Sequence, residues 1–179
     1  MPISLSGKLL IADPSLQSSI FRKSVIFISD HSLLEGAFGA IINHPSKKTV
    51  GDLVPDLSDS VLGGLQVYIG GPLASDQLTF SSIAWDKKDR LIYLPQISAQ
   101  AAAATIGISG NRIQATVGYS AWSPGQLENE LKQNTWFTRN PSEPLLNTQP
   151  DINLWKTVLE SISPYHSLLA EAPDDPSLN

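Results

Sequence analysis

The chain has 179 residues, of which 41% are hydrophobic and 16% are charged, and its formal net charge at pH 7 is −5. This acidic balance argues against a nucleic-acid-binding protein that relies on a broad basic surface, because neutralisation of phosphates supplies most non-specific affinity. The sequence contains no cysteine, which excludes disulfides, thiolate metal sites and cysteine nucleophiles.

Apolar runs in the first part of the chain predict three strands. Residues 8–12 and 24–29 are continuous apolar or β-branched stretches, which are typical of strands that are buried on both faces. Residues 37–42 are expected to form a third strand after a loop at 30–36. Because this loop is short, the second and third strands are predicted to pair as neighbours.

A short helix is expected over residues 50–53, because Thr49 stands at the N-cap position and Asp52 at the third helical position. Pro55 limits the length of this helix. The segment 57–65 is rich in Ser, Asp and Gly, and we expect it to be a mobile excursion.

The middle of the chain predicts further strands and an alanine-rich helix. Residues 67–69 are expected to form a strand that ends in Gly-Gly-Pro. Residues 78–85 and 91–94 are predicted to pair as a hairpin across a turn at 86–89. Ser98 is expected to cap the helix that follows, and a glycine ends it.

The densest pattern lies at residues 118–131, with the sequence Gly-Tyr-Ser-Ala-Trp-Ser-Pro-Gly-Gln-Leu-Glu-Asn-Glu-Leu. A strand predicted at 112–119 leads into it. A helix predicted over 124–133 leaves it, with Ser123 as the N-cap and Pro124 at the first helical position. We expect the corner between this strand and this helix to pack at the centre of the fold.

The C-terminal part is expected to begin with a strand at 135–138 and a surface crossing at 140–150. A helix is predicted over 151–161, and one or two further turns start at 163. The apolar stripe of the helix repeats at helical spacing and consists of Leu154, Trp155, Val158, Leu159 and Ile162.

Strands and helices do not alternate strictly along the chain, as they would in a doubly wound parallel sheet. We therefore expect an α+β fold with a largely antiparallel or mixed sheet. Residues 1–179 show no internal repeat and are expected to form one domain, in which residues 171–179 are an extended acidic tail. No apolar run approaches the roughly 20 residues of a membrane helix, and no secretory signal is recognisable. We expect a cytoplasmic protein without membrane contact.

Several segments of the sequence resemble the bacterial YqgE/AlgH family. They are the stretch 118–131 with Trp136 just beyond it, residues 7–16, residues 21–45 and residues 67–72. The resemblance extends from about Gly7 to Trp155, in matching order and spacing. It implies an irregular mixed or antiparallel sheet bent into a partial barrel with helices packed outside. It also implies a loose association with transcriptional regulation of alginate production, and it supplies no catalytic residues.

A serine hydrolase is the first catalytic alternative. The sequence from Gly118 to Trp122 begins like the nucleophile elbow G-x-S-x-G and lies between a predicted strand and a predicted helix. The tight elbow requires a small final residue, whereas Trp122 is the largest available, so we interpret Ser120 as part of a structural corner. The sequence still offers partners for a triad, namely His31, His44 and His166.

Metal and cofactor sites find less support. The histidines are far apart, and none pairs with another at i+3 or i+4, so we predict no metal site. The Gly70-Gly71 pair lacks the spacing and the lysine of a phosphate-binding loop, and no G-x-G-x-x-G follows a strand. No cofactor is therefore predicted.

The positions of the family-like motifs suggest where a ligand would bind. If the corner at Tyr119 and Trp122 is concave, it would form the binding pocket together with the polar end of the third strand and the glycine pair. The candidate pocket consists of Asn43, His44, Gly70, Gly71, Tyr119, Ser120 and Trp122.

We expect a cytoplasmic regulatory or interaction protein that lacks catalysis and acts through an unknown protein partner or a small ligand. The first alternative is a small serine-type hydrolase that uses Ser120 or Ser123 with a histidine. The second is direct binding of nucleic acid. The net charge disfavours it, and the helices predicted at 124–133 and 151–162 carry one lysine each.

Overall fold

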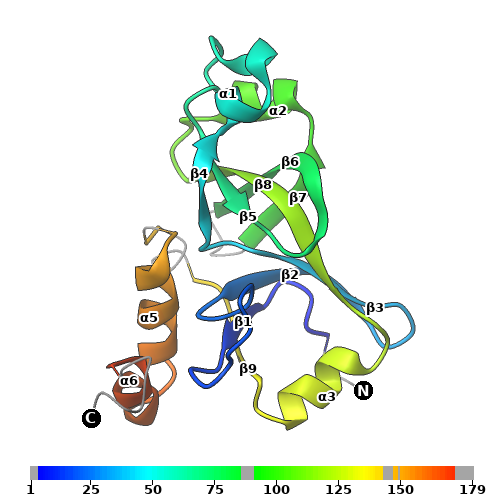
Figure 1. The fold of residues 1–179 in the computed structure, drawn as a ribbon, viewed down its shortest axis with the longest axis vertical. Helices are drawn as coiled ribbons and strands as arrows, with labels where there is room; N and C mark the ends of the chain where they lie inside the picture. Colours follow the sequence, from blue (N-terminus) through cyan, green and yellow to red (C-terminus); the bar gives the residue numbers. More distant parts are fainter. Residues whose placement is uncertain (1–3, 86–90, 143–146, 149, 172–179) are drawn as a thin grey trace.

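The computed structural model describes residues 4–85, 91–142, 147–148 and 150–171. Within these residues, nine strands form one open sheet that curls into a half-barrel, and helices pack around it (Figure 1). The strands are β1 (Leu9–Ala12), β2 (Val25–Ser32), β3 (Gly36–Ile41), β4 (Pro45–Thr49), β5 (Gln66–Ile69), β6 (Leu73–Trp85), β7 (Leu91–Ile97), β8 (Asn111–Trp122) and β9 (Trp136–Arg139). The helices are α1 (Val50–Leu53), the 3-10 helix η1 (Pro55–Leu57), α2 (Ala99–Thr105), α3 (Gln126–Lys132), α5 (Ile152–Glu160) and α6 (Pro164–Glu171).

The sheet is mixed, as the sequence and the family resemblance predicted. Its main path runs β4-β5-β8-β3-β2-β1-β9, and β6 and β7 branch from this path because β6 also pairs with β8. β5 and β8 run parallel, whereas the other strand pairs in the described part of the chain are antiparallel. β8 pairs with β3, β5 and β6, so it joins the two parts of the sheet (Figure 1).

One part of the sheet, made of β1, β2, β3 and β9, is covered on both faces. Alternate side chains of β1 point into two different hydrophobic clusters. Leu9 and Ile11 lie in the cluster that includes the buried residues of α5, which we call the α5 core. Leu10 and Ala12 lie in the cluster that includes Trp122 and Trp136, which we call the tryptophan core. Burial on both faces explains why the predicted strand is apolar throughout.

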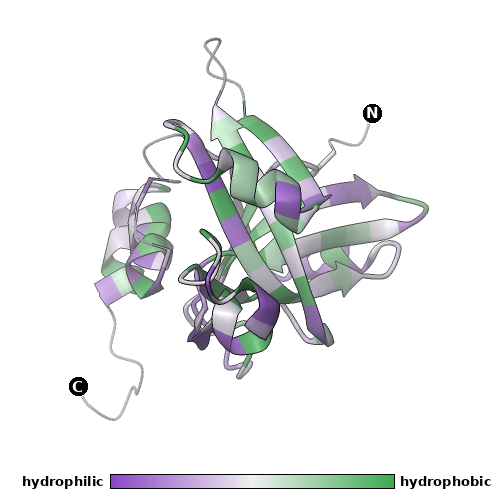
Figure 2. Cartoon of the chain, turned by 90° about the horizontal axis from the view of Figure 1, so that it is seen from above, coloured by the Kyte–Doolittle hydropathy of each residue, from purple (hydrophilic) through white to green (hydrophobic). Residues whose placement is uncertain are grey.

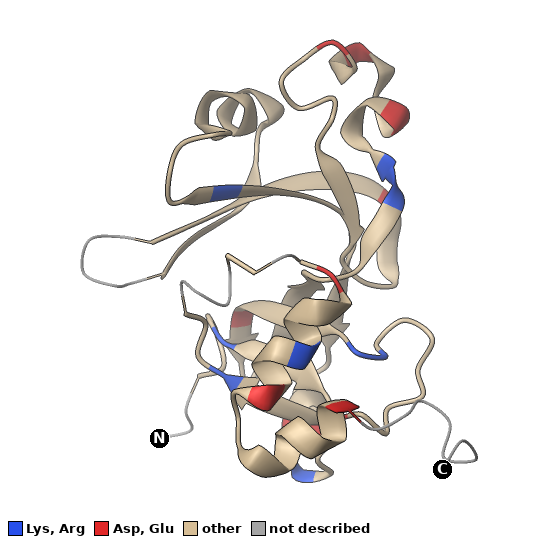
Figure 3. Cartoon of the chain, turned by 90° about the vertical axis from the view of Figure 1, so that its left-hand side faces the viewer, with Lys and Arg blue, Asp and Glu red and all other residues tan. Residues whose placement is uncertain are grey.

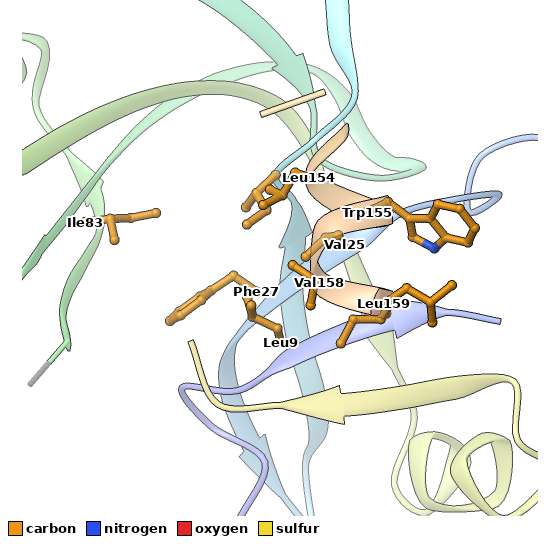
Figure 4. Close-up of a cluster of buried hydrophobic side chains, with 10 residues drawn as sticks. Leu9, Val25, Phe27, Ile83, Leu154, Trp155, Val158 and Leu159 are labelled. Atoms are coloured by element: carbon orange, nitrogen blue, oxygen red, sulfur yellow. The ribbon is translucent and has the colours of Figure 1, made fainter. Parts of the chain in front are cut away.

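α5 is held by its apolar face, as its helical spacing predicted. Asp151 caps the helix by accepting a hydrogen bond from the backbone N–H of Asn153 at 2.8 Å. The indole N–H of Trp155 donates to the carbonyl of Ala12 at 2.9 Å, which fixes α5 against β1. Figure 4 shows the buried side chains of α5 beside those of β1 and β2. The buried side chains of the helix are Leu154, Trp155, Val158 and Leu159.

α3 begins at Gln126 and not at Pro124, which corrects the predicted cap at Ser123. Gly125 adopts a left-handed conformation with φ of 77°, so the right-handed path of the helix can only start after it. The N–H of Ser123 donates to the side-chain oxygen of Gln126 at 3.0 Å. One half of a capping box therefore forms, without the side chain of Ser123.

The other part of the sheet, from β4 to β8, carries α1 and α2 on one face. α1 has the predicted capping box, in which Thr49 and Asp52 exchange hydrogen bonds between side chain and backbone. The expectation of a mobile excursion at 57–65 is wrong, because Leu62 is buried in the core beneath α1 and α2. The N–H of Gly51 also donates to the carbonyl of Gly63 at 2.9 Å, which holds the segment against α1.

The predicted hairpin of β6 and β7 is confirmed, with antiparallel pairing from Phe80 opposite Ile97 to Trp85 opposite Leu91. Ser98 caps α2 as predicted, because its side chain accepts from the N–H of Ala101. The turn predicted at 86–89 lies outside the described residues, and so does the tail beyond residue 171. In the described part of the chain, no helix combines the length and the apolarity that crossing a bilayer requires.

Candidate functional site

A cavity of about 470 Å³ lies inside the curl of the sheet. β2 and β3 form one of its walls, and β6, β7 and β8 form the other. Its volume falls within the range of roughly 300–1,000 Å³ that is typical of small-molecule sites. The position is also typical, because the mouths of curled or closed sheets commonly hold ligands.

The wall formed by β8 is polar although it is buried. Gln114 and Thr116 line the cavity, with 3% and 6% of their surfaces exposed, and Gly118 follows two positions later on the same face. The opposite face of β8 carries Ile113 and Ala115, which pack beneath α2. Seen from above, the strands alternate hydrophilic and hydrophobic residues along their length (Figure 2). In β8 the hydrophilic face points into the cavity.

The wall formed by β6 and β7 combines hydroxyl groups with an aromatic ring. Thr79, Ser81 and Ile83 alternate along β6 and line the cavity, as Tyr93 of β7 does. The phenol of Tyr93 forms a hydrogen bond with the side chain of Ser81, and its ring lies 4.5 Å from that of Phe27 between centroids. The cavity therefore adjoins the α5 core, which Phe27 and Ile83 enter from opposite walls (Figure 4).

A β-bulge in β2 brings a carboxylate to the cavity. The pairing of β2 with β3 shifts register between Ile28 and Asp30. In a regular strand, adjacent side chains point to opposite faces, but a bulge re-aims one of them. Ser29 and Asp30 consequently both line the cavity. The Ser29 hydroxyl donates to the carbonyl of Phe38 at 3.2 Å, whereas the Asp30 side chain is exposed.

Two aromatic side chains on β3 and β8 border the cavity and remain open to solvent. Phe38 is 43% exposed and Tyr119 is 41% exposed. Their rings lie 6.3 Å apart between centroids and are tilted by 41°. Both residues line the cavity. They form an aromatic surface that a ligand would contact on entering.

The electrostatic character of the cavity is acidic. Asp30 is the charged residue of the lining, and among the described lining residues none is Lys, Arg or His. Burial raises the pKa of the Tyr93 phenol, the nearby Asp30 charge raises it further, and the hydrogen bond with Ser81 partly offsets both. Tyr93 is therefore neutral at pH 7. In the part of the chain that the structure describes, Lys and Arg are interspersed with Asp and Glu (Figure 3).

Tyr119 is the residue of the predicted pocket that lines this cavity. Gly70 and Gly71 lie behind β8, where the backbone carbonyl of Tyr119 approaches Gly71 so closely that a side chain would not fit. Ser120 is buried, and its hydroxyl donates to the carbonyl of Gly70 at 3.0 Å. Trp122 lies in the tryptophan core.

Asn43 joins three segments of the chain. Its side-chain oxygen accepts from the N–H of Val25 at 2.7 Å, and its amide nitrogen donates to the carbonyls of Lys23 at 2.9 Å and Asp151 at 3.2 Å. The neighbouring His44 is partly buried, and this burial lowers its pKa, although hydrogen bonds to the backbone around Lys23 partly offset the effect. Asn43 and His44, two members of the predicted pocket, thus fasten the end of β3 to neighbouring backbone.

The histidines of the chain are engaged away from Ser120. The ring of His31 lies 2.7 Å from the Glu128 carboxylate, and that of His166 lies 2.8 Å from the Ser163 hydroxyl. Among the described residues, no group of three or more His, Asp or Glu side chains is arranged to hold a metal ion. The arrangement around the cavity provides hydrogen-bonding groups, aromatic rings and one carboxylate.

The sequence model of the AlgH-like family matches residues 9–166 of the chain, a span that contains every described strand. A UPF0301 protein of Streptomyces coelicolor is 30% identical, over 98% of this chain and 96% of its own length. A UPF0301 protein of Laribacter hongkongensis is 34% identical, over 76% of this chain and 78% of its own length.

Two solved structures share the fold. The crystal structure of a Corynebacterium diphtheriae protein gives a TM-score of 0.73 at 24% identity, and covers 96% of this chain and 94% of that one. The solution structure of the AlgH protein of Pseudomonas aeruginosa gives a TM-score of 0.66 at 25% identity, and covers 97% of both chains.

Proposed function

The chain belongs to the AlgH-like family, and on this premise we propose that it is a non-catalytic regulatory protein of the cytoplasm that binds a small organic ligand in the cavity of its half-barrel. The ligand changes how the protein engages a protein partner. The observation that carries the proposal is the cavity of about 470 Å³ with buried polar side chains on its wall.

The polar side chain of Gln114 on the cavity wall supports binding. The amide nitrogen of Gln114 donates to the carbonyl of Ile42 at 3.3 Å, and the opposite oxygen, Oε1, has no donor among the described contacts. A position that served packing alone would favour an apolar side chain, because burying a polar group costs free energy unless it forms hydrogen bonds. A ligand in the cavity would donate to this oxygen.

The hydroxyl groups near the cavity favour binding over hydrolysis. A serine nucleophile requires a base within hydrogen-bond reach. The Ser29 hydroxyl instead donates to a backbone carbonyl, and the Ser81 side chain bonds with a phenol. Ser120, the residue of the elbow-like motif, is buried and donates to a carbonyl. Incubation with a panel of hydrolysable esters is expected to give no turnover above that of buffer.

The binding proposal is tested by titrating the ¹⁵N-labelled protein with a library of small cationic, neutral and anionic molecules. A ligand of the cavity is expected to shift the amide signals of Gln114, Thr116 and Gly39, and to leave those of α6 in place. Replacing both rim aromatics, Phe38→Ala with Tyr119→Ala, is expected to weaken binding at least about tenfold, since each ring contributes apolar contact area.

The matched control is Tyr165→Ala on α6, which removes an aromatic ring that is 65% exposed and does not line the cavity. It is expected to leave the affinity unchanged. A library that produces no shifts at the cavity signals up to millimolar concentration would refute the proposed function.

A further inference from the structure

We propose that the ligand of the cavity is an organic cation, namely a small molecule that carries a primary amine or guanidinium group on an apolar body. This inference rests on the binding function proposed above and adds the charge class of the ligand. The features that carry it are the carboxylate at the bulge of β2, the acceptor on β8 and the aromatic rings of the walls.

The carboxylate of Asp30 provides the countercharge. The bulge in β2 turns it toward the cavity, and none of the described hydrogen bonds or ion pairs engages its side chain. Carboxylates accept charge-assisted hydrogen bonds from ammonium and guanidinium groups. A strand without the bulge would direct residue 30 to the opposite face of the sheet. The irregularity therefore places one negative charge where a ligand binds.

The second acceptor lies deeper on the wall formed by β8. Because Gln114 uses its amide nitrogen toward Ile42, its Oε1 remains to accept a hydrogen bond. Ammonium and guanidinium groups carry donors and no acceptors. The Asp30 carboxylate and the Gln114 oxygen are thus two acceptors that match a ligand that donates.

The aromatic rings favour the same charge class. The faces of Phe and Tyr rings are negative and attract cations within about 6 Å of the ring centroid. Phe38 and Tyr119 border the cavity, and Tyr93 lies on its far wall, so a ligand meets rings on both sides. The same rings provide contact for the apolar body of the ligand.

Anions are disfavoured at the same place. No Lys, Arg or His is found among the described lining residues, and the formal net charge of the chain is −5. An anion would approach an acidic protein and meet the Asp30 carboxylate, with no cationic side chain among the described lining residues to balance it. Phosphates and carboxylic acids are therefore unsuited to this cavity.

The test uses three probes of one shape: 3-phenylpropylamine as cation, 3-phenylpropanol as neutral analogue and 3-phenylpropanoate as anion. Isothermal titration calorimetry and ¹⁵N chemical shifts on the full chain measure their affinities. The amine is expected to bind up to about fivefold more tightly than the alcohol, which is the upper end for an exposed charge pair, and the anion is expected to bind weakest. Raising the salt concentration should weaken binding of the amine and leave binding of the alcohol unchanged.

Asp30→Asn is expected to remove the preference for the amine and to leave the affinity of the alcohol unchanged. Asp59→Asn is the matched control, because it makes the same charge change at an exposed turn outside the cavity lining. It should keep the preference. Equal affinities of amine and alcohol for the unmodified protein, or tighter binding of the anion, would overturn the inference.

The two proposals fail separately. If neutral or anionic members of the library shift the cavity signals while amines and guanidines do not, the cavity binds ligands but the charge class assigned here is wrong. If no class of compound shifts these signals, the binding function itself is refuted, and the charge class is refuted with it.

Discussion

The carboxylate of Glu130 holds two tryptophans at once. Its Oε2 accepts the indole N–H of Trp122 at 2.8 Å and that of Trp136 at 2.7 Å. Both rings are nearly fully buried and meet edge to face, with centroids 6.2 Å apart. One acceptor on α3 therefore satisfies donors from the end of β8 and the start of β9.

Glu130→Ala is expected to lower the free energy of unfolding by about 3 kcal/mol, because two buried donors lose their acceptor. Glu130→Gln keeps an oxygen at the same place, so its free energy of unfolding should fall by clearly less. Urea denaturation at pH 7 measures both. The control is Glu160→Ala, whose carboxylate lies 3.8 Å from Lys156 in an exposed pair and should cost less than about 1 kcal/mol. Equal losses for the two alanine variants would contradict the role assigned to Glu130.

His44 makes the stability depend on pH. Burial lowers its pKa in the folded protein below the ordinary value of about 6.5. Below that value the unfolded chain binds more protons than the folded one, so the free energy of unfolding falls as the pH drops. The contribution is complete above about pH 6.5 and is lost progressively toward the folded-state pKa.

His44→Gln is expected to reduce the loss of stability between pH 7.5 and pH 5.5, because glutamine does not titrate. Urea denaturation of both proteins at several pH values measures the slopes. The m-values should agree, which would show that the variant unfolds from the same compact state. Parallel pH profiles for the two proteins would rule out a contribution of His44.

At the scale of elements, the close backbone contact between β8 and the pair Gly70 and Gly71 depends on Gly118. This residue has φ of 73°, and a side chain there would place its Cβ 2.5 Å from the carbonyl oxygen of Gly71. Gly125 offers a matched comparison, because its φ is 77° and an added Cβ would meet no atom within 4 Å. The left-handed conformation costs about 1–2 kcal/mol for alanine at either position.

Gly118→Ala is therefore expected to destabilise the protein by at least about 2 kcal/mol more than Gly125→Ala, since only the first variant adds a clash with backbone. Thermal and urea denaturation of the two variants measure the difference. Similar losses would mean that β8 and the glycine pair can move apart at little cost.

The elements that could be predicted are those fixed by local chemistry. The caps at Thr49 and Ser98 form as expected, because each polar side chain bonds with a backbone N–H only a few residues away. The helix predicted to start at Asp151 begins at Ile152, with Asp151 as its cap. The cap at Ser123 was misplaced, because the left-handed Gly125 decides where α3 begins. Glycine permits that conformation without requiring it, so the sequence does not disclose it.

The cavity could not be predicted, for two physical reasons. Alternation in β8 normally indicates that the polar face meets solvent, but Gln114 and Thr116 are buried because the sheet curls over them. The bulge at Ser29 depends on pairing with β3 and leaves no mark in the sequence of β2 alone. The family-like motifs drew attention to the corner at residues 118–122, of which Gly118 and Tyr119 line the cavity.

For the molecule as a whole, the acidic net charge predicts that nucleic acid is not bound. The formal net charge is −5, and among the described residues basic side chains are interspersed with acidic ones (Figure 3). We expect no binding of labelled duplex DNA or RNA in fluorescence anisotropy at about 50 or about 200 mM salt. Binding that falls steeply between these concentrations would revive direct contact with phosphates.

The place of β8 in the sheet also governs the order in which the protein can assemble during synthesis. The antiparallel pairs β1–β2, β2–β3, β4–β5 and β6–β7 join strands that follow one another in the chain, so each can form locally. These locally formed pairs join into one sheet only through β8, residues 111–122, because it pairs with β3, β5 and β6. Until the ribosome releases that segment, the edges of β3, β5 and β6 that pair with β8 stay unpaired, and a nascent chain is then prone to associate with its neighbours.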